Sequence, residues 1–459
     1  MKRGESLSDI IVAPATASGG ALTLLRLSGA GSIALCDKIF DGRTPLTEAP
    51  SHTLHYGTIR STEGEVIDDL LLSLFRAPRS YTGEESVEIS CHGSQIIVLK
   101  LLERLIEAGA RPAAPGEFTQ RAYLNGRLDL SQAEAVADLI AARSEAALNL
   151  ASRQMRGNYS SALEELRAEL VRLSALVELE LDFSEEDVEF ADRGEIAHTM
   201  EQILREIVRL EESFRVGNAL REGVAVAIVG EPNVGKSTLL NRLVGDERAM
   251  VSEIAGTTRD TIEERIRIQG VEFRFIDTAG LHQTEDRLEQ MGIHRTLAAI
   301  KQAEVVLQVA DAGNPDFAPL QLREDQHHLL LLNKADLLSQ EQLKALQSAL
   351  SERPQPSIIL SAKLDQGVDQ LRHLLRQTID TGALERGETI VSNSRHCTAL
   401  KEARQALLEA LEALRNGLPT DLLAEDLRQV AHHLGTITGS EISSSEILQA
   451  IFSKFCIGK

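Results

Sequence analysis

The sequence contains no run of apolar residues that approaches the ~18 needed to cross a membrane. We also expect no signal peptide ahead of Ser8. The four cysteines, Cys36, Cys91, Cys397 and Cys456, lie far apart and show neither a CxxC pair nor Cys/His ligand spacing. Their scarcity and spacing argue against a zinc site and indicate a reducing, cytoplasmic environment.

Basic residues are also scarce relative to acidic ones. The 459 residues include 48 Lys and Arg against 69 Asp and Glu, a net charge of −21. Bulk electrostatics therefore cannot hold a nucleic acid, which would need a local basic patch or a partner protein. The hydrophobic content of 43% is typical of a soluble globular protein. The length predicts about three domains.

The most informative segment present is Gly230–Ser237, which fits G-x-x-x-x-G-K-[ST]. Residues 224–229 before it predict a buried strand, and residues 238–243 after it open an amphipathic helix. In such a loop the backbone N–H groups wrap a phosphate chain, a lysine adds a cation and a hydroxyl faces Mg²⁺. We expect nucleotide contacts from Asn233, Val234, Gly235, Lys236, Ser237 and Thr238.

A second element predicts which base the site binds. The apolar residues 329–332 predict a buried strand that runs into Asn333-Lys334-Ala335-Asp336, an N-K-x-D element. The Asp336 carboxylate accepts from guanine N1–H and the exocyclic amine, donors that adenine lacks. A site of this kind can reject the wrong base by roughly 10⁴-fold. Contacts to the guanine oxygen are expected after the strand 358–360, from Ser361, Ala362 and Lys363.

Two further segments complete the expected GTP site. The strand 273–276 runs into Asp277, Thr278, Ala279 and Gly280, which supply a Mg²⁺-side aspartate and a glycine that senses the γ-phosphate. The segment 255–260 contains Thr258, the expected switch threonine, which completes the Mg²⁺ shell with Ser237. Five elements in this order predict a GTPase domain over residues 221–377.

The route to hydrolysis is less direct. Leu281 follows Gly280, where Ras-type GTPases place a water-orienting glutamine, and leucine cannot hydrogen-bond a water. The Asn233 amide oxygen offers one substitute, because it could ligate a monovalent cation where an arginine finger otherwise puts charge. Backbone carbonyls of residues 252–257 could close that shell. The alternative is that Asn233 only stabilises the loop, and the residues alone leave both open.

The flanks of the predicted GTPase domain are helical. Apolar residues recur at helical spacing in four stretches, 163–181, 203–210, 400–414 and 423–434. We expect one helical domain, residues 121–220 and 378–459, interrupted by the GTPase domain. Two separate helical bundles are the alternative.

Residues 1–120 predict an α+β domain with no nucleotide motif of its own. The expected strands are 10–13, 22–27, 70–75 and 86–90, and the expected helices are 32–40 and 96–108. The fold class is thus multidomain: an α+β N-terminal domain, an all-α helical domain and an inserted α/β P-loop domain.

Several segments outside the GTPase motifs are more specific still. They are Ser80–Glu84 (SYTGE), Gly116–Thr119 (GEFT), Arg121–Leu130 (RAYLNGRLDL), Gln132–Ala135 (QAEA) and Phe455–Lys459 (FCIGK). On these segments the chain resembles the MnmE (TrmE) family of tRNA-modifying GTPases from Asp9 to Lys459.

The resemblance implies a folate-binding and dimerising N-terminal domain. It implies a homodimer and an FAD-dependent partner, MnmG (GidA). With that partner the family adds an aminomethyl-type group to C5 of the wobble uridine of certain tRNAs, using a tetrahydrofolate derivative (a 5-formyl or methylene form). It also implies K⁺-stimulated GTP hydrolysis with paired GTPase domains. The competing hypothesis is a regulatory switch GTPase of the ribosome-assembly type without folate chemistry.

The family pattern also implies individual roles. K⁺ ligands fall on Asn233, Ser252, Ile254 and Thr257, and Mg²⁺ ligands on Ser237 and Thr258. Further GTP contacts fall on Glu253, Ala255 and Gly256. Glu289 matches the acid that helps position the attacking water. Folate contacts fall on Arg26, Glu88, Arg127 and Lys459, although Arg127 stands where the family often has lysine.

Two cysteines raise separate questions. Cys456 is the family's C-terminal cysteine, and both thiol chemistry and an inert, packed side chain remain open. Cys91 precedes His92, and we expect a buried structural pair there rather than a catalytic one.

Overall fold

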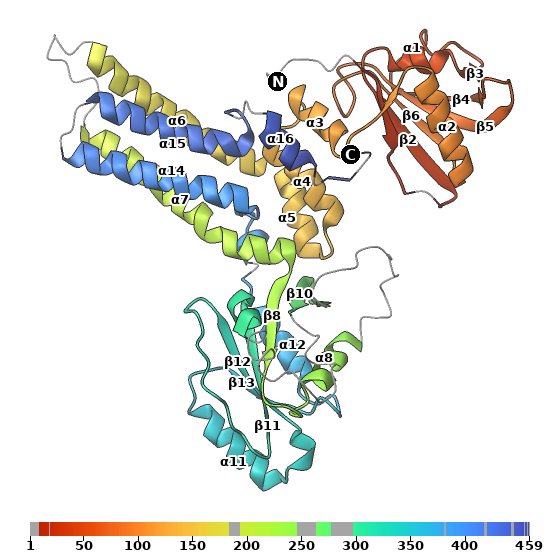
Figure 1. Ribbon diagram of the computed structural model, residues 1–459. Coiled ribbons are helices and arrows are strands. Elements are labelled where there is room, and N and C mark those ends of the chain that lie inside the picture. The colour runs from red at the N-terminus through yellow and green to blue at the C-terminus, as the bar shows by residue number, and fades with distance from the viewer. Residues whose placement is uncertain are drawn as a thin grey trace. The chain divides into compact units, whose positions relative to one another are not determined.

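The structure, a computed structural model (Figure 1), describes most of the chain. The described residues are 9–17, 19–182, 193–245, 263–276, 297–380, 382–416, 420–441, 445–453, 455, 456 and 458. They form two compact units. The first is drawn from Met1–Ile140, Arg153–Leu204 and Glu402–Lys459, and the second from Ala141–Ser152 and Arg205–Lys401. Within the described ranges no helix combines the length and apolar character that a membrane span needs.

The N-terminal part of the first unit is built on a sheet of seven strands among the described residues, in the order β3-β4-β5-β6-β2-β1-β7. Neighbours pair antiparallel, except that β1 and β7 are parallel. The strands are β1 (Ile11–Pro14), β2 (Leu22–Ser28), β3 (Phe40–Gly42), β4 (Thr53–Arg60), β5 (Val66–Phe75), β6 (Ser86–His92) and β7 (Arg111–Pro112). The four strands expected from the sequence are therefore confirmed.

One face of this sheet is covered by helices α1 (Ser32–Asp37) and α2 (Gln95–Glu107). Alternate strand side chains such as Leu25, Leu72 and Ile89 point to that face and are fully buried. The helix expected over residues 32–40 was too long. The Asp37 carboxylate accepts from the Leu46 N–H and the chain turns there, so Phe40 pairs with Ile59 of β4 instead.

A buried ion-pair network fastens helix α3 (Glu117–Leu124) to the start of the chain. The Arg121 side chain is only 1% exposed, and its guanidinium contacts Asp9 at 2.8 Å, Glu117 at 3.0 Å and Glu84 at 3.3 Å. Arg111 binds the same Asp9 and Glu117 carboxylates. Burial by itself raises the pKa of Glu117, but hydrogen bonds from Arg111 and the Ala114 N–H outweigh it and lower the pKa.

A further group of helices comes from both sides of the GTPase motifs. Those that flank the two sheets of the described chain are α4 (Leu130–Ala141), α5 (Glu145–Met155), α6 (Asn158–Asp182), α7 (Arg193–Glu222), α13 (Gly382–Glu385), α14 (Ser394–Arg415), α15 (Thr420–Thr438) and α16 (Ser445–Phe452). Helix α4 begins with a capping box, in which Asp129 accepts from the Gln132 N–H and the Gln132 side chain accepts from the Asp129 N–H. The bundle in Figure 1 joins both halves, because α6 packs along α15 and Arg415 of α14 pairs with Glu201 of α7.

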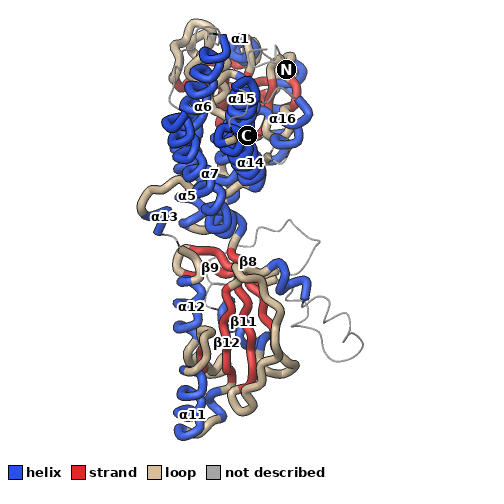
Figure 2. The backbone as a smooth tube through the Cα atoms, turned by 90° about the vertical axis from the view of Figure 1, so that its left-hand side faces the viewer, coloured by secondary structure: helices blue, strands red, loops and turns tan. Residues whose placement is uncertain are grey.

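The second unit is centred on a sheet that has six strands in the described residues, in the order β13-β12-β11-β8-β10-β9. The strands are β8 (Val224–Val229), β9 (Glu264–Ile268), β10 (Val271–Phe275), β11 (Val305–Asp311), β12 (His327–Asn333) and β13 (Ser357–Ile359). β9 and β10 pair antiparallel and the other neighbours are parallel. Figure 2 shows β8, β11 and β12 running side by side.

Helices cover both faces of this sheet. α8 (Lys236–Gly245) and α12 (Val368–Gln377) pack in one cluster with Val226 and Leu331, whereas α11 (Gln340–Ser351) packs with Leu332 on the opposite face. The parallel strands are thus buried on both sides, which explains their unbroken apolar sequences. The short 3₁₀ helix η2 (Ala335–Leu337) follows β12. The expected multidomain fold with an inserted P-loop domain is confirmed.

Most of helix α5 belongs to this second unit. Leu150 lies in the same apolar cluster as the sheet residues of β8 to β10, and the Ala146 N–H donates to the Gly270 carbonyl at 3.2 Å. Gly270 forms the turn between β9 and β10 with φ +81°. A segment far upstream in the sequence therefore caps part of the GTPase core.

Replacing Glu117 by glutamine should weaken the attachment of α3 to β1. The substitution removes a buried negative charge and leaves Arg121 under-compensated, which costs roughly 3 kcal/mol. Because the folded pKa of Glu117 is lowered, its contribution is present above the unfolded pKa of ~4.5 and is lost as pH falls through the folded value. Amide hydrogen exchange of α3 and β1 in the whole chain should therefore show lower protection than wild type at pH 7, with the gap closing in acid.

The exposed Glu103 of α2 provides a matched control. Glu103→Gln should leave the protection of α3 and β1 unchanged. Equal protection of wild type and Glu117→Gln at pH 7 would contradict the role given to this network.

Candidate functional site

The phosphate loop connects β8 to α8, and two of its glycines are required by close backbone approach. Gly230 has φ +150°, and a Cβ there would lie 2.1 Å from the Val309 carbonyl oxygen. Gly235 has φ +95°, and a Cβ there would lie 2.2 Å from the Asn333 Nδ2 atom. Any side chain at either position would push the loop away from its neighbours. The predicted loop is thus shaped by its packing against β11 and β12.

The side chains of the loop are arranged around the N-terminus of α8. Lys236 opens the helix, and its Nζ donates to the carbonyl oxygens of Gly230 at 2.8 Å and Glu231 at 2.7 Å. Burial lowers the pKa of the Lys236 ammonium. Ser237 follows on the first turn, and Asn233 sits exposed on the loop in the left-handed region with φ +63°. A helix N-terminus, a lysine and a hydroxyl fit a phosphate chain with Mg²⁺.

Asn333 ties the phosphate loop to the base-binding loop. Its side chain is nearly inaccessible, and the Nδ2 group donates to the Val234 carbonyl at 2.8 Å while Oδ1 accepts from the Ala362 N–H at 2.9 Å. The same amide therefore donates a hydrogen bond to one loop and accepts a hydrogen bond from the other. This contact brings together the phosphate loop, the N-K-x-D element and the segment 361–363.

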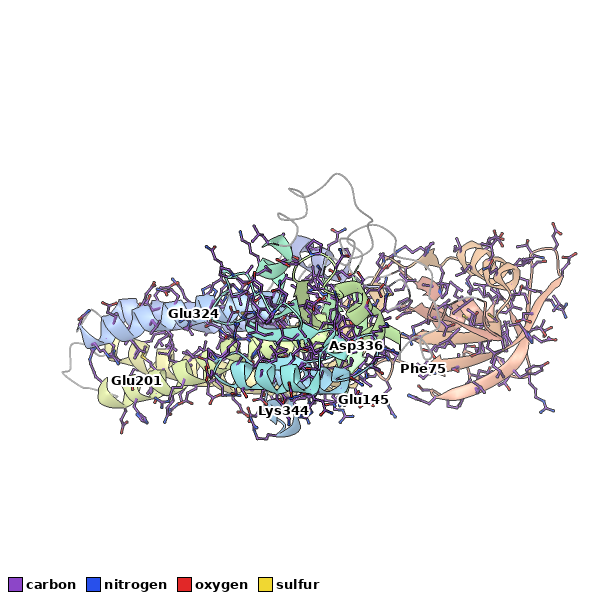
Figure 3. The ribbon with its side chains drawn as sticks, turned by 90° about the horizontal axis from the view of Figure 1, so that it is seen from below. Phe75, Glu145, Glu201, Glu324, Asp336 and Lys344 are labelled. Atoms are coloured by element: carbon purple, nitrogen blue, oxygen red, sulfur yellow. The ribbon has the colours of Figure 1, made fainter. Side chains whose placement is uncertain are left out.

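Asp336, labelled in Figure 3, is oriented from the same loop. The Ser361 hydroxyl donates to Asp336 Oδ1 at 2.6 Å, and the Ala335 N–H donates to the Leu360 carbonyl at 3.1 Å. Ser361 is itself fixed by a two-way backbone bridge with Gln366. The carboxylate is therefore held in one position without a ligand, which fits the predicted guanine-reading role.

Other predicted residues of the GTP site lie outside the described residues. They are Ser252, Glu253, Ile254, Ala255, Gly256, Thr257, Thr258, Asp277, Thr278, Ala279, Gly280, Leu281 and Glu289. Their roles stay predictions.

The predicted folate residues Arg26 and Glu88 face each other across β2 and β6. Arg26 Nη2 lies 2.8 Å from Glu88 Oε1, and the two side chains are 15% and 22% exposed. The Arg26 guanidinium also lies 5.1 Å from the centre of the Tyr81 ring and 5.8 Å from that of Phe118. Sequence reasoning missed both aromatic neighbours, although each lies inside a segment on which the resemblance rests. Arg127 packs its stem against Gly83.

The C-terminal tail lies against the N-terminal sheet. The Gly116 N–H donates to the Cys456 carbonyl at 3.3 Å, and a Cβ on Gly458 would lie 2.0 Å from the Pro14 carbonyl oxygen. Pro14 follows Ala13, which pairs with Arg26 in the ladder between β1 and β2. Gly458 thus lies against β1, the strand that pairs with the one carrying Arg26, and Lys459 lies outside the described residues.

Two expectations about cysteines need correction. Cys456 is exposed, which contradicts the packed alternative, while thiol chemistry at this residue stays a prediction. Cys91 is buried, as expected, and burial raises the pKa of its thiol to about 11. His92 is not buried with it, because neighbouring residues on a strand point to opposite faces. The His92 side chain is 64% exposed, and its Nδ1 lies 2.7 Å from Asp68 Oδ1.

A six-stranded sheet of this order among the described residues, with a phosphate loop joined to an N-K-x-D element, defines a P-loop GTP-binding domain. The domains around it are matched by two family models. The model of the GTP-binding protein TrmE N-terminus matches residues 10–127, and that of the MnmE helical domain matches residues 130–456.

Full-length relatives agree with these models. The tRNA modification GTPase MnmE of Porphyromonas gingivalis is 47% identical over 466 residues, covering 98% of this chain and 98% of the relative. That of Christiangramia forsetii is 46% identical over 474 residues, covering 99% and 100%. The chain belongs to the MnmE family of tRNA modification GTPases, which confirms the resemblance and the GTP hydrolase class.

Solved structures give a more distant likeness. The G-domain of FeoB from Methanococcus jannaschii is 21% identical with a TM-score of 0.22, over 34% of this chain and 96% of that one. Translation elongation factor SelB from Methanococcus maripaludis, with a GTP analogue, is 17% identical with a TM-score of 0.25, over 34% of both chains.

Asp336→Asn should change the base preference of this site. The amide can no longer accept from both guanine donors, so GDP affinity should fall by about 100-fold or more, given roughly 1.5–3 kcal/mol for each hydrogen bond to a charged group. Xanthosine diphosphate should bind better than GDP, because its extra carbonyl accepts from the new amide. Calorimetric titration of the whole chain with both nucleotides measures this change in preference.

Asp369→Asn serves as the matched control, since Asp369 on α12 is 95% exposed and outside the site. It should bind both nucleotides as wild type does. If GDP still binds better than the xanthosine nucleotide to Asp336→Asn, the base-reading role of Asp336 is wrong.

Proposed function

We propose that the chain is a K⁺-stimulated GTPase that acts with an FAD-dependent partner, MnmG (GidA), on tRNA. Together they install an aminomethyl-type group at C5 of the wobble uridine, with a tetrahydrofolate derivative as the one-carbon donor. The observation that supports the folate part is the position of Gly458 in the C-terminal tail, which lies against Pro14 of β1, the strand paired with that of Arg26. Gly458, next to the predicted folate residue Lys459, thus lies against the same sheet that carries the predicted folate residues Arg26 and Glu88.

The surroundings of Arg26 are suited to an anionic, aromatic ligand. The guanidinium is flanked by the rings of Tyr81 and Phe118 and paired with Glu88. A ligand carboxylate can exchange for Glu88 at Arg26, and the released Glu88 carboxylate can accept from pterin N–H groups. Without the family assignment, a partly exposed ion pair of this kind would contribute little on its own.

An apolar surface supports the homodimer. On the sheet face opposite α1 and α2, four large side chains, Leu22, Leu54, Tyr56 and Leu71, are 65%, 61%, 68% and 37% exposed. They share that face with the Arg26–Glu88 pair, because Leu54 pairs with Ser73, Ser73 with Glu88 and Glu88 with Arg26 along one row of the sheet. A second copy of the chain would cover this face and enclose the ligand.

The acidic character of the chain supports a partner for tRNA. With a net charge of −21, the protein repels a polyanion at long range. MnmG is the proposed source of the missing positive surface.

The K⁺ proposal rests on Asn233. It occupies a left-handed backbone position on the exposed side of the phosphate loop, where its amide oxygen is accessible to a bound cation. A cation at this place would take over the charge that other GTPases obtain from an arginine finger. Mg²⁺ would bind between the phosphates, Ser237 and Thr258.

GTP hydrolysis per chain should rise with protein concentration in K⁺ and stay low in Na⁺. Asn233→Ala should abolish the K⁺ stimulation, a loss of at least ~10-fold, because the charge near the leaving group is lost. Steady-state phosphate release over a range of protein concentrations in each salt measures this. Asn149→Ala, an exposed asparagine on α5, is the control. Equal rates in both salts at all concentrations would refute the K⁺ proposal.

Nucleoside mass spectrometry of bulk tRNA tests the proposed reaction. Cells lacking the chain should lose C5-aminomethyl-type uridines, and wild-type rescue should restore them. Neither Lys236→Ala nor the double variant Arg26→Ala, Glu88→Ala should restore more than about a tenth of the wild-type level of these uridines. The first removes a predicted GTP contact and the second removes predicted folate contacts. The double variant Arg172→Ala, Glu169→Ala, which removes an exposed ion pair on α6, should rescue fully.

The possible results separate the parts of the proposal. Full rescue by the Arg26, Glu88 double variant would refute the folate site while leaving the GTPase role intact. Unchanged tRNA in cells lacking the chain would refute the tRNA reaction, and the regulatory switch would then be the better account.

A further inference from the structure

Lys334, the second residue of the N-K-x-D element, is held by a residue that no motif includes. Its Nζ lies 2.9 Å from Oδ2 of Asp311, the last residue of β11. β11 and β12 are parallel, and Asp311 is in register with Asn333. The ladder itself therefore places an aspartate next to the guanine-reading element.

Asp311 is fixed from its own side. Its Oδ1 accepts from the Gly313 N–H at 2.9 Å, and its carbonyl accepts from the Asn314 N–H at 3.0 Å. The hydrogen bond from Lys334 outweighs desolvation and lowers the pKa of the Asp311 carboxyl. The carboxylate is ionised at neutral pH and points from a rigid turn toward Lys334.

Lys334 occupies a position where its direction matters. Its backbone is left-handed, with φ +67°, and this turn leads the chain from β12 into η2 so that Asp336 meets Ser361. The side chain leaves the backbone between Asn333 and Asp336. If Asp336 reads the base edge as predicted, this four-carbon stem borders the space that the base enters, and the contact with Asp311 fixes the far end of the stem.

The strength of this ion pair distinguishes a role in fold stability from a role in ligand binding. Both side chains are about one third exposed, 34% and 33%, and ion pairs of that exposure add little to stability. Restraining a lysine before binding has a different effect, because the ligand no longer has to order it. The pair is therefore suited to preparing a site rather than to holding the fold.

We infer that Asp311 is a positioning residue of the guanine site. It anchors the Lys334 ammonium so that the aliphatic stem forms a wall against the face of the purine ring. Asp336 reads the edge of the base and Lys334 covers its face. The two contacts are separable, since the ring face is common to guanine and hypoxanthine, whereas the exocyclic amine is present in guanine alone.

The test measures binding of GDP and inosine diphosphate to the whole chain by calorimetry. Asp311→Asn should weaken both nucleotides by the same factor, about three- to ten-fold, from the cost of ordering one long side chain. The ratio of GDP to inosine diphosphate affinity should stay at the wild-type value, in contrast to Asp336→Asn, where it should collapse. Asp311→Glu should recover part of the loss, because it keeps the charge.

Ionic strength gives a readout that a purely structural role would not change. Raising the salt concentration screens a partly exposed ion pair. The ratio of the wild-type GDP affinity to that of Asp311→Asn should therefore fall toward one. The melting temperature without nucleotide should match wild type. Asp325→Asn is the control, since it removes a comparable pair with Arg323 in the same unit.

Three outcomes would overturn the inference. They are GDP affinity within two-fold of wild type in Asp311→Asn, a changed ratio of GDP to inosine diphosphate affinity, and a fall in melting temperature that accompanies the loss of both nucleotides. The last would assign Asp311 to holding the turn alone.

Discussion

The GTP site depends on the side chain of Asn333, because this one amide joins two loops that otherwise share no backbone ladder. Its donor binds the phosphate loop at Val234 and its acceptor binds the base loop at Ala362. The amide can do both only because Gly235 leaves room for it. A buried amide with one of these partners missing would cost the desolvation of the unpaired group, so the loops are locked in their relative positions. Phosphate binding and base reading thus share one anchor.

In the first unit, contacts join parts of the chain that are distant in sequence. Tyr123 of α3 packs in one cluster with Phe452 and Phe455, and its hydroxyl donates to the Gly439 carbonyl at 2.7 Å. Contacts of such long sequence separation bring Gly458 of the tail against Pro14 of β1. This contact between the two ends of the chain can form only after the helices between them have packed.

Much of the GTP site could be predicted from the sequence, because buried parallel strands appear as apolar runs and the loops after them carry recognisable spacing. The partnering of side chains could not. The pairing of Arg26 with Glu88 depends on strand register, which neither residue encodes alone. Strand β4 was missed because only Gly57 and Ile59 of its residues are buried, which leaves no apolar run in the sequence. The helix predicted over residues 32–40 ran too far because only the Asp37 contacts mark the turn. Asp311 belongs to no motif, and its role depends on the register of β11 with β12.

Charged pairs serve two purposes in this chain, and their burial separates them. Arg121 is almost fully buried among three carboxylates, so losing one partner strands a charge and loosens the attachment of α3. Lys334 and Asp311 remain partly hydrated, so their attraction is weak and their value is geometric. A strong pair at the guanine site would bring little benefit, since the domain core already holds the strands. A weak one that orders a single stem suffices, because binding gains from whatever ordering is complete before the base arrives.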